Sequence, residues 1–198
     1  MPSDPPMTSL CRSDLLPHLN SQGLQLLRIL HLSMLVFPLV FLGAIVFIHQ
    51  QNTPAEANNL PGVATALPKA WLLGLVLLIP LPWVASSIIQ GRLFAPKGIR
   101  QRFAAHTGAK ELVGEALQFL RMVVIIRSSL FEAASMLGLV LLMLAAQDGV
   151  THSQTLVWVA TLPLLSQLVD TFLNFPSRDS IATQMDKKIL KPLQGEDA

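Results

Sequence analysis

The sequence predicts an all-α fold, a polytopic membrane protein built as a bundle of four transmembrane helices. Of 198 residues, 52% are hydrophobic and only 13% are charged, about half the roughly 25% of an ordinary soluble domain. The apolar residues are concentrated in four segments, each close to the roughly 20 residues that a helix needs to cross the hydrocarbon core of a bilayer. These features exclude a disordered chain and a conventional water-soluble enzyme domain. The single cysteine, Cys11, excludes an intrachain disulfide.

The predicted spans are distributed along residues 1–198, which we interpret as a single integral membrane domain. The first span carries only two basic or titratable residues, Arg28 and His31, and both lie near its start. A long polar loop separates the second span from the third, and a polar tail follows the fourth. The predicted spans are, approximately, residues 26–48, 71–90, 126–146 and 155–175.

The distribution of basic residues predicts the orientation, because Lys and Arg accumulate on the cytoplasmic side of membrane proteins. Apart from Lys69, every basic residue lies before or at the entry to the first span, in the loop 91–125 or at the adjoining start of the third span, or in the tail 176–198. With an even number of spans, these three regions share one side of the membrane. We therefore expect both termini and the loop 91–125 to be cytoplasmic.

Helical spacing predicts further structure in the loop and in the tail. Pro96 and Gly98 prevent the start of the loop from forming one uninterrupted helix. From Thr107, apolar residues at helical spacing predict an amphipathic helix that runs into the third span, and up to Ala146 it would measure roughly 60 Å. In the tail, a short helix is expected from Ser177 onward. Three apolar residues share one side of that helix: Ile181, Met185 and Ile189.

The residues that could carry chemistry are the polar ones inside the apolar segments. Glu132 on the third span and Asp170 on the fourth both lie toward the predicted cytoplasmic end. A carboxylate in hydrocarbon costs at least about 2.5 kcal/mol, so each should face the bundle and find a partner. Arg127 and Glu132 are five residues apart and point in different directions, which favours pairing across helices. The candidate intramembrane polar cluster consists of Glu132, Asp170, His31, Arg28, Arg127, Ser128 and Gln167.

Three interpretations of this cluster remain open. In the first, an ion-pair and hydroxyl network fixes how the helices pack, which predicts a structural, assembly or accessory component of a membrane complex. In the second, Glu132 and Asp170 form a proton or cation site, which predicts a small transporter or ion-conducting subunit using an inner-leaflet carboxylate cluster. In the third, Arg28, Arg127 and Asp170 extend toward the membrane surface.

The sequence lacks the motifs of common enzyme classes. It contains no zinc-binding His-Glu-x-x-His, no phosphate-binding glycine loop and no Gly-x-Ser-x-Gly nucleophile motif. We therefore expect no enzymatic activity, no catalytic residues, no metal and no cofactor. The expected partners are the lipid bilayer and membrane proteins, including further copies of this chain. Arg100 and Arg102 are interpreted as anchors to anionic headgroups rather than as a nucleic-acid site.

The run from Ile125 to Ala134, which includes Arg127, Ser128 and Glu132, resembles a segment of small four-span bacterial membrane proteins to which no activity is assigned. The resemblance is centred on the third predicted span. It implies a multi-pass protein of the bacterial cytoplasmic membrane and does not imply an activity.

Overall fold

A computed structural model describes residues 12–19, 21–52, 74, 76–103, 108–153 and 155–195, and all regular structure in these ranges is helical. The helices occur in two compact units. The elements in chain order are α1 (Arg12–Leu15), η2 (Leu16–His18), α2 (Ser21–Gln51), α5 (Pro80–Leu93), α6 (Pro96–Phe103), α7 (Ala109–Gln147), α8 (Val150–Ser153), η3 (Thr155–Thr161), α9 (Leu162–Leu173), α10 (Arg178–Met185), η4 (Asp186–Leu190) and α11 (Lys191–Gln194).

Three helical segments are long and apolar enough to cross a membrane. They are α2, residues Lys110–Gln147 of α7, and the continuous run Thr155–Leu173 formed by η3 and α9. This confirms an all-α chain with long apolar helices, which could span a membrane, at the first, third and fourth predicted positions. Of the second predicted span, 71–90, residues 71–73 and 75 lie outside the described residues, and α5 covers residues 80–90. This helix is not among the three that are long and apolar enough to cross a membrane.

The two units are each assembled from segments that are distant in the sequence. Unit 1 consists of Met1–Leu30, Ser87–Ile126 and Phe175–Ala198. Unit 2 consists of His31–Ser86 and Arg127–Asn174. The helices α2, α5 and α7 each contribute residues to both units.

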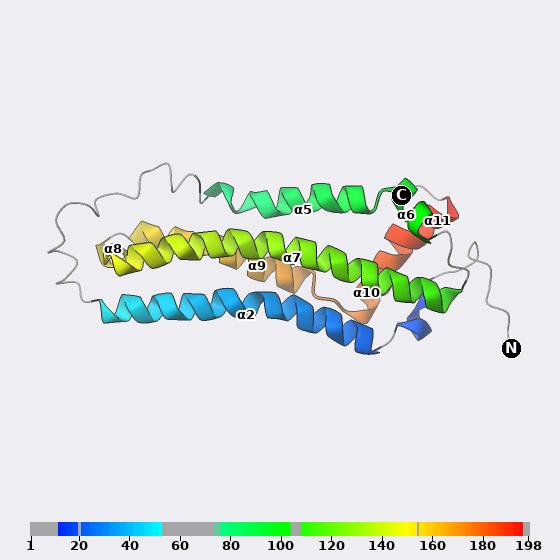
Figure 1. The fold of residues 1–198 in the computed structure, drawn as a ribbon, viewed down its shortest axis with the longest axis horizontal. Coiled ribbons are helices and arrows are strands. Elements are labelled where there is room, and N and C mark those ends of the chain that lie inside the picture. The colour runs from blue at the N-terminus through cyan, green and yellow to red at the C-terminus, as the bar shows by residue number, and fades with distance from the viewer. Residues whose placement is uncertain are drawn as a thin grey trace. The chain divides into compact units, whose positions relative to one another are not determined.

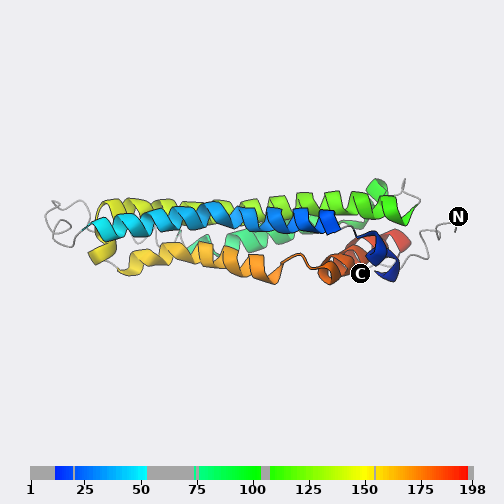
Figure 2. The same cartoon turned by 90° about the horizontal axis from the view of Figure 1, so that it is seen from below.

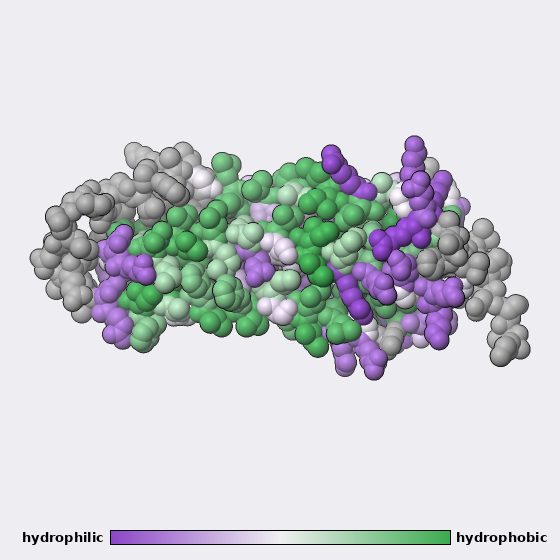
Figure 3. All heavy atoms as spheres, viewed as in Figure 1, coloured by the Kyte–Doolittle hydropathy of each residue, from purple (hydrophilic) through white to green (hydrophobic). Residues whose placement is uncertain are grey.

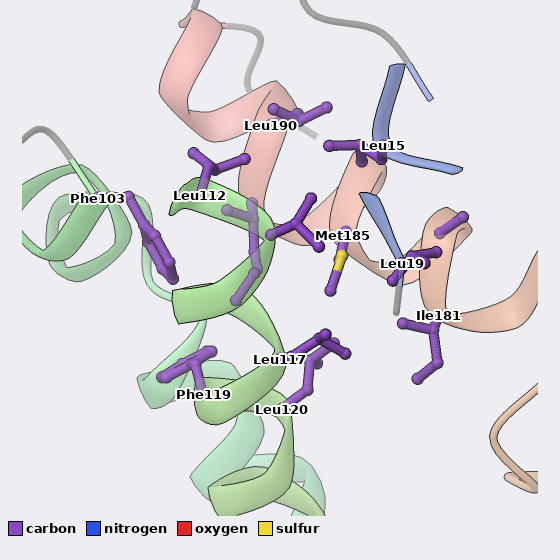
Figure 4. Close-up of a cluster of buried hydrophobic side chains, with 14 of the residues drawn as sticks. Leu15, Leu19, Phe103, Leu112, Leu117, Phe119, Leu120, Ile181, Met185 and Leu190 are labelled. Atoms are coloured by element: carbon purple, nitrogen blue, oxygen red, sulfur yellow. The ribbon is translucent and has the colours of Figure 1, made fainter. Parts of the chain in front are cut away.

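Unit 1 has a closed hydrophobic core in which the start of α7 packs against the tail (Figure 4). The predicted interruption of the loop is confirmed, since α5 ends at Leu93 and α6 begins at Pro96, a residue suited to a first helical turn. The predicted amphipathic extension is also confirmed, because α7 is a single helix of 39 residues. In the tail, the hydroxyl of Ser177 caps α10 by accepting a hydrogen bond from the backbone N–H of Ser180. The three apolar tail residues predicted to share a side are all buried: Ile181, Met185 and Ile189.

Unit 2 has an apolar core and an apolar surface. Its portions of α2 and α7 run alongside α9 in both views (Figures 1 and 2). Gly138 on α7 lies against η3 so closely that a Cβ atom there would stand 2.4 Å from the carbonyl oxygen of Ala160. Outside this core, Val40 on α2 and Phe172 on α9 are 66% and 77% exposed. In Figure 3 hydrophobic residues cover most of the visible face of unit 2, as expected of a surface solvated by lipid.

Candidate polar centre of unit 2

A group of polar side chains lies inside unit 2, and most of them belong to α9; we call this group the polar centre. Ser166, Gln167, Asp170 and Thr171 are spaced so that they share one face of this helix, and Asn174 follows as its C-cap. Gln167 and Asp170 are each 2% exposed. The side chains on this face contact three other helices, α2, α5 and α7.

Asp170 forms an ion pair with Arg127 of α7. The Nε–H of Arg127 donates to Oδ1 and Oδ2 of Asp170 over 3.1 and 3.2 Å, and the terminal Nη2 of Arg127 also donates to Oδ1. The carboxylate side chain is 3% exposed and the arginine side chain 19%. Because the two opposite charges are held together, the pair as a whole carries no net charge. This geometry confirms pairing across helices.

Two further side chains complete the surroundings of the pair. The amide nitrogen of Asn174 donates to Oδ1 of Asp170 over 3.0 Å, so the carboxylate has a second donor. The indole ring of Trp83 on α5 lies 5.8 Å from Cζ of Arg127, within the range of a cation–π interaction. Its Nε1–H donates to the hydroxyl of Ser166 over 2.9 Å. Trp83 therefore joins α5 to both α7 and α9.

Contacts to α2 come from the remaining polar residues of α9. Nε2 of His31, a side chain 3% exposed, lies 3.1 Å from the carbonyl oxygen of Thr171. A carbonyl oxygen can only accept, so Nε2 of His31 carries the proton. The amide nitrogen of Gln167 donates to the carbonyl oxygen of Met34 over 3.0 Å. Both bonds satisfy backbone or side-chain groups that would be costly to leave unpaired in hydrocarbon.

The remaining predicted site residues lie in different surroundings and do not join the Arg127–Asp170 pair. Ser128 is buried on α7, beside Arg127 in the sequence. Glu132 is half-buried on α7, and its carboxylate makes no hydrogen bond or ion pair with the described residues. Arg28 belongs to unit 1, where its Nε–H donates to the carbonyl oxygen of Pro176 over 3.0 Å and its guanidinium lies 5.9 Å from the ring centre of Phe175.

A second polar group in unit 2 was not predicted. The rings of His49 and His152 are stacked with centres 4.0 Å apart, and Trp158 meets His49 edge-on at 5.4 Å. Nε2 of His152 donates to the carbonyl oxygen of His49 over 2.8 Å. Nδ1 of His49 lies 2.8 Å from the hydroxyl of Thr151. The signal was available, because His49 follows the first predicted span and His152 follows the third, on the same predicted side.

The arrangement in both groups is that of packing contacts. Among the described residues, no group of three or more His, Cys, Asp or Glu side chains is placed to hold a metal ion. Comparison with models of known protein families, with curated protein sequences and with solved structures finds no match.

Proposed function

We propose that this chain is a four-span protein of the bacterial cytoplasmic membrane with both termini and the loop 91–125 on the cytoplasmic side. Leu30 and Ser87 both belong to unit 1, so the segment between them leaves this unit and returns to it. The same holds for the segment between Ile126 and Phe175. A segment that returns to its starting side crosses the membrane an even number of times. The first returning segment holds α2, which supports a second crossing at the predicted span 71–90.

The distribution of charge supports the proposed orientation. Within the described residues, unit 2 contains one Lys or Arg, the ion-paired Arg127, and all the others belong to unit 1. Unit 1 combines the N-terminal segment, the loop and the tail, which are the three basic regions of the sequence. A unit that gathers these regions on one side agrees with the retention of Lys and Arg in the cytoplasm.

We infer that the chain acts as a structural, assembly or accessory component of a membrane complex. The observation that carries this proposal is the buried Arg127–Asp170 pair, which is neutral as a whole and further bonded by Asn174. A carboxylate that binds a fixed arginine is unsuited to releasing and taking up a transported cation. Its contacts instead join α9 to its neighbours, which is the role of a packing element.

The environment of Glu132 supports the proposal that this component binds a partner. It lies in α7, one of the helices long and apolar enough to cross a membrane, and it is half-buried. Its carboxylate has no hydrogen-bond or ion-pair partner among the described residues. A carboxylate in a spanning helix needs a donor or a cation. A donor on a second membrane protein, or on another copy of this chain, would provide it. The same observation favours the alternative that Glu132 is the proton or cation site of a small transporter.

The two proposals are separated by Glu132→Gln, with Asp148→Asn as the matched control. Asp148 is an exposed acid in the turn after α7, so its substitution removes the same charge outside the spanning stretch. Full-length protein is purified from its native membranes in a mild detergent, and co-purifying subunits and self-association are quantified. The same preparations are reconstituted in liposomes, and proton and sodium flux are measured.

The accessory role predicts a stoichiometric assembly that is weakened by Glu132→Gln and unchanged by Asp148→Asn, with no flux from either protein. Flux that is present in the wild type and lost in Glu132→Gln, while the assembly is unchanged, would establish the transporter alternative. A chain that purifies alone and conducts no ion would contradict both.

A further inference from the structure

Unit 1 contains a pocket between the end of α5 and the tail. It has a volume of about 610 Å³, within the roughly 300–1,000 Å³ of small-molecule sites. The pocket is lined by Ser87, Gln90, Gly91, Phe94, Pro96, Lys187, Lys188 and Pro192. Among these lining residues, two carry a positive charge and none carries a negative one.

The two lysines enter the pocket from one turn of the tail. Lys187 and Lys188 are neighbours in η4, a π-helical turn, and such turns occur frequently at functional sites. Nζ of Lys188 donates to Oε1 of Gln90 over 3.4 Å and lies 4.5 Å from the ring centre of Phe94. Lys187 is exposed and forms no ion pair with the described part of the chain. Lys188 is therefore held at the wall of the pocket by contacts to α5.

The other walls are held firmly in place. Nε of Arg100 on α6 donates to the carbonyl oxygen of Pro192 over 2.8 Å, which ties α6 to α11. Ile189 and Leu190, which follow the lysines, are buried in the core of unit 1. The tail that carries the lysines is thus fixed by its own apolar side. A site on such a tail is ordered before its ligand arrives, which lowers the entropy lost on binding.

The lining combines a cationic side with an apolar side that is open to its surroundings. Phe94, Pro96 and Pro192 supply apolar surface. A Cβ atom built on Gly91 would meet nothing within 4 Å. Ile88, the residue after Ser87 on α5, is 55% exposed. An inorganic ion would use the lysines alone, whereas a ligand with a phosphate and a hydrocarbon body would use both sides.

We propose that this pocket binds the phosphate of an anionic phospholipid headgroup, with Lys187 and Lys188 as its cationic contacts. Basic pockets at the cytoplasmic ends of spanning helices are suited to such headgroups, because cations near an anionic surface are attracted to it. The hydroxyl of Ser87 and the amide of Gln90 supply polar groups for the glycerol and ester region. The proposal depends on the membrane placement of the chain and not on its accessory role.

The test measures lipid binding to delipidated full-length protein by native mass spectrometry. The probes are phosphatidylglycerol, phosphatidylcholine with the same acyl chains, and inorganic phosphate. The variant is Lys187→Gln/Lys188→Gln. Its matched control is Lys97→Gln/Lys110→Gln, which removes the same charge from two exposed positions of unit 1 outside the pocket.

We expect the first phosphatidylglycerol to bind the wild type and the control equally, and the pocket variant about 30-fold more weakly, because each lysine contributes roughly fivefold. Phosphatidylcholine should bind weakly to all three proteins. Displacement of phosphatidylglycerol by inorganic phosphate would overturn the assignment to a lipid. An equal loss in the control, or no loss in the pocket variant, would overturn the site. If the double variant fails to fold, the single variant Lys187→Gln tests the site, and it should bind phosphatidylglycerol roughly fivefold more weakly.

Discussion

Substitution of the Arg127–Asp170 pair is expected to have a large, strongly coupled effect on stability. Asp170→Asn keeps the shape of the side chain but leaves the guanidinium of Arg127 without its counter-charge. Removal of one member of a buried pair costs about 3–5 kcal/mol. The Arg127 side chain is 19% exposed and keeps the ring of Trp83, so we place this cost near 3 kcal/mol. Arg127→Met should cost at least as much, since it leaves a carboxylate that is only 3% exposed.

The double variant Arg127→Met/Asp170→Asn distinguishes a pair from two separate polar residues. No charge is then left unpaired in unit 2's polar centre, so the expected cost is about 3 kcal/mol rather than the roughly 6 kcal/mol of the two single changes added together. The coupling free energy is therefore about 3 kcal/mol. It is measured by reversible unfolding in mixed dodecylmaltoside and SDS micelles, followed by far-ultraviolet circular dichroism.

The chain provides its own reference pair for this measurement. Arg102 and Glu115 of unit 1 are 2.8 Å apart, and their side chains are 41% and 27% exposed. Exposed pairs contribute roughly 0.2–1 kcal/mol, so the same cycle on this pair should give a much smaller coupling. Additive costs at Arg127 and Asp170, to within about 0.5 kcal/mol, would refute the reasoning. So would a coupling no larger than that of the exposed pair.

Three further changes test the packing of each unit in the same unfolding assay. Gly138→Ala forces the backbone of η3 away and should lower the free energy of unfolding by about 1–3 kcal/mol. Gly43→Ala is the control, because a Cβ atom there meets nothing within 4 Å, and it should be neutral or stabilising. Equal effects of the two substitutions would contradict the close contact at Gly138. Met185→Ala, at a side chain 1% exposed, should cost about 2–5 kcal/mol, and a loss below 1 kcal/mol would mean that the tail is not part of the core. Ser177→Ala removes the cap of α10 and should cost about 1 kcal/mol, with faster amide exchange over 178–185; unchanged exchange there would contradict the cap.

The helices were largely predictable because their signals are local. Apolar runs of about 20 residues require no knowledge of the rest of the chain, and α2 and the end of α7 lie where these runs are. The stop at Leu93 and the start at Pro96 follow from proline chemistry. Spacing alone placed Ile181 and Met185 on one side of the tail helix, and both are buried. In each case the residues that decide the structure are neighbours in the sequence.

The contacts of the polar centre were predictable only in part, because they depend on which helices meet. Gln167 and Asp170 were predicted to belong to one polar cluster, and both are buried in the structure. The sequence could not decide between Arg28 and Arg127 as the partner of Asp170, since both are basic and lie near the ends of predicted spans. Nor could it identify Trp83, whose ring is apolar by composition and whose role depends on α5 lying beside α7 and α9.

The two ends of α7 expose different kinds of residue, although α7 is a single helix. Before Ile126, its buried residues alternate with exposed charged or polar ones such as Glu111 and Gln118, which is the pattern of a helix between an apolar core and water. Between Ser129 and Gln147, the exposed positions are apolar instead, with Leu137 at 51% and Leu144 at 53%. The helix itself does not break, because backbone hydrogen bonding is independent of what surrounds the side chains. The passage of α7 from one unit to the other is therefore accompanied by a gradual change in the character of its exposed face, and not by an interruption of the helix.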